Sequence, residues 1–98
     1  MSDLIPEDLM LKMMESHREM AKGSVDDHYP VVKLFCIASN AKWLLSEIDP
    51  TDKDLAFGLC DLGMGFPELG YVSLEEIASF RHPVNGMKII ERDDIHLP

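Results

Sequence analysis

The sequence predicts an α+β fold, with an N-terminal amphipathic helix and a second short helix packed on an antiparallel, meander-like sheet of four to five strands. Three observations lead to this prediction. Apolar residues recur at helical spacing near the N-terminus. From Pro30 onward the chain is rich in β-branched and aromatic residues, which favour strands. Turn formers separate these runs, and sequential strands with short connections favour a meander.

The first predicted element is a helix from about Pro6 to Lys22. Pro6 suits the first helical position, and the acidic Glu7 and Asp8 complement the positive end of the helix. Gly23 supplies a left-handed stop. One face of this helix is apolar: Leu9, Met10, Met13, Met14, His17, Met20 and Ala21. A methionine stripe at this spacing predicts a core-facing side rather than a docking groove, with His17 packed rather than acting as a ligand.

Four strand-like segments follow in residues 30–38, 41–48, 54–62 and 68–74: PVVKLFCIA, AKWLLSEI, DLAFGLCDL and ELGYVSL. The third is almost continuously apolar, which predicts a central strand. Gly58 within it predicts a bulge or a close approach of two backbones.

A second helix is predicted from Leu74 to about Arg81, ending before Pro83. Ser73 and Glu76 match the S-x-x-E capping box, in which each side chain bonds the backbone of the other residue. After an Asn85-Gly86 turn, MKIIE in residues 87–91 is the last predicted strand, and the acidic tail RDDIHLP is poorly specified.

Length and charge limit the classes of function. The 98 residues suffice for a single domain, 1–98, with one core. The 18 Asp and Glu against 9 Lys and Arg give a net charge of −9. Because phosphate contacts need clustered Lys and Arg, this balance argues against direct nucleic-acid binding and against an anionic membrane. The acidity serves solubility, or it matches a partner with a basic surface.

The cysteines and the N-terminus indicate a cytoplasmic protein. MSDLIPEDLM carries acids where a signal peptide needs an apolar core, and no run approaches the length of a membrane span. Cys36 and Cys60 lie in apolar strand-like runs. We expect both thiols to be reduced and to behave as small core residues.

Residues 60–74, CDLGMGFPELGYVSL, place two large apolar side chains in a glycine-rich loop. In the more ordinary interpretation Phe66 folds back under the loop and plugs one end of the core. In the functional interpretation Met64 and Phe66 are exposed as a contact patch rimmed by acids. The candidate partner-binding residues are Asp61, Met64, Phe66, Glu68 and Tyr71.

No catalytic, metal or cofactor motif is complete. Asp49, Asp52 and Asp54 lack the ligand spacing of a calcium loop, the cysteines lack zinc-site pairing, and there is no G-x-S-x-G. GMGFPELG lacks the lysine of a phosphate-binding loop. We therefore expect no cofactor and no metal. The enzymatic alternative is a polar cluster of Asp61, Glu68 and Tyr71 in a cleft.

The stretch NAKWLLSEIDPTDKDLAFGLCDLGMGFPELGYVSLEEI, residues 40–77, resembles the signature of an uncharacterised bacterial domain-of-unknown-function family. The similarity is looser over 4–32 and 84–96, and residues 83–94 depart from the family pattern, which has a shorter connection before ERDLHF. The resemblance implies a setting on plasmids and other mobile elements, and no activity.

These observations predict a small, acidic, non-catalytic interaction protein, an accessory of a bacterial mobile element. Its expected partner is a protein with a basic or apolar surface, and homo-oligomerisation is left open. A further alternative is DNA mimicry directed at a host restriction or defence enzyme. Mimicry requires one face to carry these acids in rows: Asp49, Asp52, Asp54, Glu75, Glu76, Glu91, Asp93 and Asp94.

Overall fold

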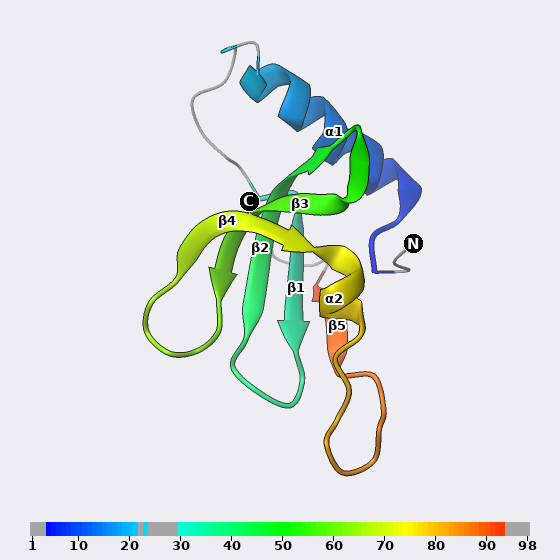
Figure 1. Ribbon diagram of the computed structural model, residues 1–98, viewed down its shortest axis with the longest axis vertical. Coiled ribbons are helices and arrows are strands. Elements are labelled where there is room, and N and C mark those ends of the chain that lie inside the picture. Colours follow the sequence, from blue (N-terminus) through cyan, green and yellow to red (C-terminus); the bar gives the residue numbers. More distant parts are fainter. Residues whose placement is uncertain (1–3, 22, 24–29, 94–98) are drawn as a thin grey trace.

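The computed structural model describes residues 4–21, 23 and 30–93 of the chain. Within these residues the elements are α1 (Glu7–Ala21), β1 (Val32–Cys36), β2 (Lys42–Asp49), β3 (Asp52–Asp61), β4 (Glu68–Ser73), α2 (Leu74–Ala78) and β5 (Ile90–Asp93). The strands form one antiparallel sheet in the order β4-β3-β2-β1-β5 (Figure 1). The predicted α+β class is confirmed.

The sheet is a meander with one departure. From β1 to β4 each strand pairs with the next along the chain, and β3 lies between β2 and β4. The last strand, β5, instead pairs with β1 at the opposite edge. The chain reaches that edge through α2 and the loop of residues 79–89, and α2 lies in front of β5 in Figure 1.

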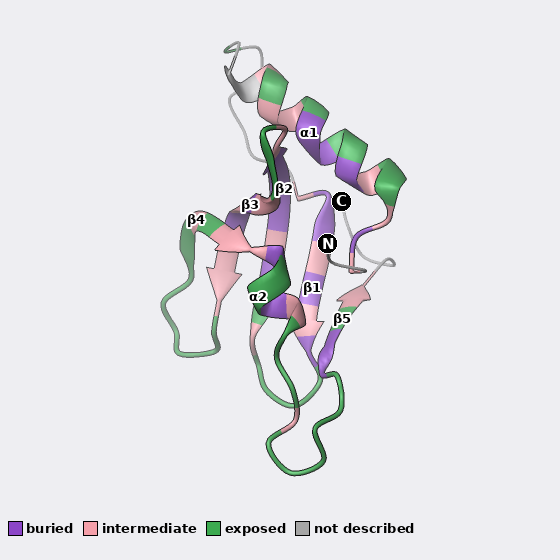
Figure 2. Cartoon of the chain, turned by 45° about the vertical axis from the view of Figure 1, so that its right-hand side comes forward, coloured by how far each residue is buried: buried purple, intermediate pink, exposed green. Residues whose placement is uncertain are grey.

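The two faces of the sheet differ in burial. Residues paired across antiparallel strands point to the same face, so Val32 shares a face with Leu45, and Leu34 shares it with Trp43. These four side chains are buried. We call this side the core face. Buried residues concentrate here and on one side of α1, whereas the loops at the other end of the molecule are exposed (Figure 2).

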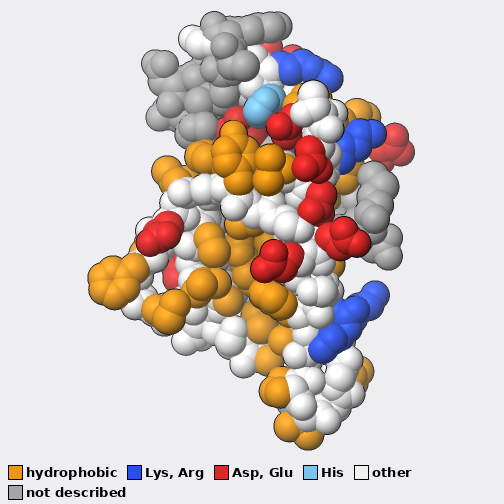
Figure 3. All heavy atoms as spheres, viewed as in Figure 1, with side chains coloured by type: hydrophobic (Ala, Val, Ile, Leu, Met, Phe, Trp, Pro, Cys, Tyr) orange, Lys and Arg blue, Asp and Glu red, His pale blue; other side chains and the backbone are white. Residues whose placement is uncertain are grey.

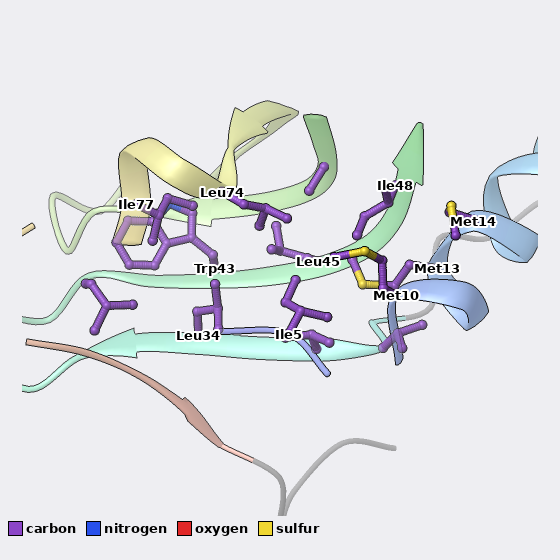
Figure 4. Packing of buried hydrophobic residues seen from close by; sticks show 14 of the residues in the cluster. Ile5, Met10, Met13, Met14, Leu34, Trp43, Leu45, Ile48, Leu74 and Ile77 are labelled. Atoms are coloured by element: carbon purple, nitrogen blue, oxygen red, sulfur yellow. The ribbon is translucent and has the colours of Figure 1, made fainter. Parts of the chain in front are cut away.

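Two helices complete the core (Figure 4). α2 packs on the core face with Leu74 and Ile77. α1 lies at the end of the sheet and contributes Met10, Met13 and Met14 to the same cluster. The prediction that the methionine stripe is a core face is confirmed at these three positions.

A β-bulge in β2 changes which side chains enter the core. Leu45 pairs with Gly58 and Glu47 pairs with Phe57, so Ser46 is the extra residue between them. The Ser46 hydroxyl donates a hydrogen bond to the Phe57 carbonyl at 3.3 Å. Beyond the bulge Ile48 returns to the core face, and Glu47 points to the other face.

Gly58 is required opposite this bulge. A Cβ at position 58 would overlap the carbonyl oxygen of Leu44 and lie 2.7 Å from the Cα of Leu45. Both atoms belong to the backbone of β2, which a side-chain rotation cannot move. Of the two alternatives predicted at Gly58, the close backbone approach is present there, and the bulge lies on the facing strand at Ser46.

α1 is also linked to β2 by polar groups. His17 Nδ1 lies 3.6 Å from Glu47 Oε1, and the Glu47 side chain is buried. His17 is therefore packed against the sheet, as predicted.

The start of α2 is capped, although not by the predicted pair of side chains. The Ser73 hydroxyl accepts a hydrogen bond from the Glu76 N–H at 3.1 Å, which confirms Ser73 as the N-cap. A second acceptor comes from Asp54 of β3. Its carboxylate accepts from the Ser73 hydroxyl at 2.5 Å and from the Glu75 N–H at 2.7 Å. A residue distant in sequence thus completes the cap, although at other donors than the Ser73 N–H expected to bond the Glu76 side chain.

Ser73→Ala is expected to lower the free energy of unfolding by about 1 kcal/mol, or roughly 4–8 °C in melting temperature, because a capping acceptor is lost. Asp54→Ala should destabilise by about 1–3 kcal/mol, since the half-buried Ser73 hydroxyl and the Glu75 N–H both lose a charged acceptor. Urea unfolding of the double variant should show a coupling of about 0.5 kcal/mol or more. In the matched cycle with Glu76→Ala the effects should add. Additivity of Ser73 and Asp54 would contradict the shared cap.

α2 is shorter than predicted, ending at Ala78 instead of Arg81. The Arg81 guanidinium donates to the carbonyls of Ala78 and Phe80 at 2.6 and 2.9 Å, and its backbone forms an isolated bridge with Lys88. These contacts turn the chain away before Pro83 is reached.

The last strand begins three residues and ends two residues later than predicted: it is Ile90–Asp93, not 87–91. The register of β5 is determined by its pairing with β1, which is distant in sequence. Ile90 is buried opposite Cys36, and Asp93 Oδ2 lies 3.7 Å from Lys33 Nζ on β1. Met87 instead belongs to the exposed loop, where its carbonyl accepts from the His82 N–H at 2.9 Å.

The first helix and the first strand differ from their predicted ranges at their ends. α1 begins at Glu7 and ends at Ala21, and the predicted last residue, Lys22, lies outside the described residues. β1 covers 32–36 of the predicted 30–38. The predicted turn at Asn85-Gly86 is present, with Gly86 at φ 69°.

Candidate functional site

The glycine-rich loop of residues 62–67 joins β3 to β4 and presents its apolar side chains to solvent. Met64 is 71% exposed and Phe66 is 81% exposed. The expectation that Phe66 plugs the core is therefore wrong. That end of the core is already filled by Trp43, which is buried and whose ring lies 6.1 Å from that of Phe80.

The loop is held at its base. Asp61 accepts a hydrogen bond from the Gly63 N–H at 2.9 Å and lies 3.9 Å from the Lys42 ammonium. Gly63 and Gly65 have φ of 80° and 83°, which permits the reversal between the strands. The site residue Asp61 thus has a structural role in shaping the loop.

Tyr71 and Glu68 of β4 point to opposite faces of the sheet. Tyr71 pairs with Phe57, and their rings meet edge to face at 5.0 Å on the face opposite the core. Glu68 pairs with Cys60 and points to the core-face side. Along β3, Phe57, which pairs with Tyr71, lies four positions before Asp61, roughly 13 Å at the rise of a strand. Asp61, Glu68 and Tyr71 therefore do not form the catalytic cluster considered above.

A second apolar region lies on the face opposite the core, which we call the open face. Leu44, Leu59 and Leu69 form a row across three neighbouring strands, beside the Phe57–Tyr71 pair. In the described part of the chain none of these side chains belongs to the buried cluster. Sequence reasoning missed this region, although β3 gave a signal. β3 is an inner strand, as predicted, and its nearly continuous hydrophobicity also reflects apolar side chains on both of its faces.

The loop and the open face meet along β4. We define the apolar surface as the exposed side chains Leu62, Met64, Phe66, Leu69 and Tyr71. Figure 3 shows hydrophobic side chains over the β3–β4 loop and β4, with acidic side chains bordering them. Contiguous exposed apolar groups of this kind are typical of protein interaction sites.

The segment that carries this surface has charge of one sign. From Asp54 to Phe80 the sequence contains no Lys, Arg or His, but it contains Asp54, Asp61, Glu68, Glu75 and Glu76. The segment from Asp54 through α2 therefore presents an acidic border at the apolar surface.

The acidic side chains considered for metal binding accept hydrogen bonds within turns and at the start of α2. Asp49 accepts from the Thr51 N–H and hydroxyl at 2.8 and 2.7 Å, and these bonds hold the pKa of Asp49 below its ordinary value. Asp52 accepts from the Asp54 N–H at 3.1 Å. Among the residues that the structure describes, no group of three His, Cys, Asp or Glu side chains is arranged to hold a metal ion.

Both cysteines are free. Burial raises the pKa of the Cys60 thiol above its ordinary value of 9.0, and this effect exceeds that of a hydrogen bond with the Trp43 side chain, which lowers it. Because the thiolate is the nucleophile, Cys60 is a poor candidate for covalent catalysis.

In a Cys36→Ala background, the rate of Cys60 alkylation by iodoacetamide should rise with a midpoint above pH 9.0. The raised pKa favours the protonated thiol in the fold, so its contribution to stability is present below the unfolded pKa. That contribution is lost as pH rises through the folded pKa. A midpoint at neutral pH would contradict the assignment.

A separate groove of about 340 Å³ lies between the β1–β2 turn and the loop after α2. Its walls include Trp43, Phe80, Pro83 and Ile89. Arg81 also borders it, but this guanidinium already bonds the carbonyls at the end of α2. Cys36 and Ser39 also line the groove, but its described lining contains no Asp, Glu or His that could act as a base for either of them.

No helix within the described residues is long and apolar enough to span a membrane. A scan against protein-family models matches residues 4–97 to DUF2958, described as a protein of unknown function. The chain belongs to this family. Membership in DUF2958 confirms the resemblance to an uncharacterised domain family, and the match includes the divergent residues 83–94. Neither the search of curated proteins nor that of solved structures gave a match.

Proposed function

We propose that this DUF2958 protein is a non-catalytic interaction module that binds a partner protein through the apolar surface, as an accessory of a bacterial mobile element. The observation that carries the proposal is the exposure of Met64 and Phe66 at the tip of a structured loop. Each is a large apolar side chain whose transfer from water into an interface is favourable.

The way in which the base of the loop is held supports this proposal. Asp61 fixes the first turn through Gly63, and a Cβ at position 63 would lie only 2.9 Å from the Cβ of Asn40 in the β1–β2 turn. The base of the loop is therefore packed against a neighbouring turn. A pre-positioned apolar tip loses less conformational entropy on binding than a free one.

The chemistry of the partner follows from the border of the surface. Lys42 is close to Asp61, but Glu68, Glu75 and Glu76 are exposed, and none of them forms an ion pair with a residue that the structure describes. A partner with apolar groups surrounded by Lys and Arg matches both features.

The test is affinity capture from a host bacterial lysate, comparing wild type with Met64→Asp/Phe66→Asp. We expect the variant to lose specific partners while its melting temperature is unchanged. The matched control is Val84→Asp/Met87→Asp, which alters two equally apolar side chains, 87% and 65% exposed, on the other long loop. Identical partner sets for wild type and the Met64/Phe66 variant would contradict the proposal.

DNA mimicry is less well supported as a second candidate. Glu75 and Glu76 lie on α2, which covers the core face, whereas Glu91 and Asp93 point to the open face through their pairing with Phe35 and Lys33. Asp93 is also paired with the Lys33 ammonium. The predicted position Asp94 lies outside the described residues. The described acids therefore divide between two faces and form no single row.

A further inference from the structure

The two edges of the sheet differ in how they are protected. β5 is a four-residue strand with three consecutive charged residues, Glu91, Arg92 and Asp93. The Arg92 guanidinium bonds the Leu4 carbonyl at 2.6 Å, which ties this edge strand to the N-terminal segment. Short and highly charged edge strands are a usual means of preventing further strand pairing.

β4, at the other edge, has none of these features. Its six residues, Glu68–Ser73, contain no Pro, Lys or Arg. They pair with β3 in an unbroken register from Glu68–Cys60 to Ser73–Leu55, without a bulge. Within the described residues no backbone bond outside the β3 ladder reaches residues 68–72. One side of β4 therefore presents backbone donors and acceptors available for pairing.

Side chains on β4 define what could pair there. Leu69 and Tyr71 are exposed on the open face, two residues apart, so an added strand would place alternate side chains beside them. Glu68 precedes this pair, and Glu75 and Glu76 follow the strand. Acids thus lie beyond both ends of an apolar strand, in a segment with no basic residue.

We propose that β4 is a strand-addition site for an extended segment of the partner protein. This segment has apolar side chains at alternate positions and Lys or Arg at its ends. The inference rests on the proposed interaction function and names the partner's recognition element. Charge complementarity selects this occupant over a second copy of the chain, because two copies would bring together acidic borders on molecules of net charge −9.

The probe is the peptide acetyl-Lys-Val-Thr-Val-Thr-Val-Lys-amide, titrated into the ¹⁵N-labelled protein and followed by NMR. At about 1 mM peptide we expect shifts in the amide signals of residues 68–73, together with about tenfold slower exchange of amides at the free edge of β4. An analogue with Glu in place of both Lys should bind at least about fivefold more weakly. An analogue with Pro at the central Val should not slow exchange, because Pro lacks the N–H and disrupts the extended pairing.

Charge reversal on the protein tests whether the peptide binds at β4. Glu68→Lys should weaken binding of the basic peptide by about fivefold. Glu91→Lys makes the same change at the exposed position of β5 and should leave binding unchanged. Any one of three results would overturn strand addition: equal effects of the two variants, binding of the Pro-containing peptide equal to that of the basic peptide, or no binding of the basic peptide at about 1 mM. Concentration-dependent dimerisation that protects β4 would also overturn it, in favour of a second copy.

The two proposals fail in different experiments. If Met64→Asp/Phe66→Asp abolishes partner capture but no peptide protects β4, the interaction function stands and strand addition is wrong. If the basic peptide protects β4 while the loop variant captures every partner, the loop is wrong as the binding surface and the strand site is supported on its own.

Discussion

Gly58→Ala is expected to lower the free energy of unfolding by about 3 kcal/mol, measured by urea denaturation. The added methyl group would meet the backbone of β2 at the Leu44 carbonyl and at the Leu45 Cα, 2.7 Å away. Neither atom can move without separating the strands at the bulge, so the cost includes ladder hydrogen bonds as well as steric overlap.

The control for Gly58 lies directly across the ladder. Gly70 of β4 pairs with Gly58, and a Cβ at position 70 would meet nothing within 4 Å. Gly70→Ala should therefore change stability by no more than about 0.5 kcal/mol, in the stabilising direction if at all. Similar losses from both substitutions would show that strand glycine content, and not contact with β2, determines the effect.

Met13→Ala is expected to destabilise the protein by about 2–5 kcal/mol, because it leaves a cavity between α1 and the sheet. The Met13 side chain is fully buried, at 0% exposure, beside Met10 and Ile48 (Figure 4). α1 makes its main contacts with β2, so few other interactions could compensate for the loss.

Leu11→Ala is the matched control in the same helix. Leu11 is 54% exposed, so its truncation should cost no more than about 0.5 kcal/mol. Thermal unfolding followed by circular dichroism would compare the two variants. A loss for Met13→Ala as small as that for Leu11→Ala would contradict the placement of α1 on the sheet.

The features predicted correctly are those fixed by local chemistry. The N-cap at Ser73 depends on backbone groups three residues away, and the core face of α1 depends on spacing within one helix. Gly58 was recognisable because glycine is costly in a strand interior unless close packing requires it. In each case the decisive interaction, or its signature, is contained in a few neighbouring residues.

The features predicted incorrectly depend on partners far along the chain. The register of β5 is determined by Cys36 and Lys33, and the cap of α2 is completed by Asp54, which lies 21 residues before Glu75. The exposure of Phe66 depends on the fact that Trp43 already fills the core end near the loop. Spacing within a segment contains no information about such competition between distant side chains.

The candidate site was predicted in part for the same reason. Met64 and Phe66 were identified from the loop sequence, but the open face was not, since its row of Leu44, Leu59 and Leu69 comes from three strands. The separation of Glu68 from Tyr71, by contrast, follows from the strand predicted at 68–74, because residues three apart in a strand point to opposite faces.

The hydrogen bond between Arg92 and the Leu4 carbonyl has a consequence for how this fold can be arranged in proteins. It joins residues 88 positions apart, so the chain enters and leaves the described fold at adjacent points. Domains with neighbouring entry and exit points can be inserted into a surface loop of another protein without spreading the ends of that loop. The apolar tip at Met64 and Phe66 lies in a separate loop between β3 and β4, so such an insertion would not have to interrupt it.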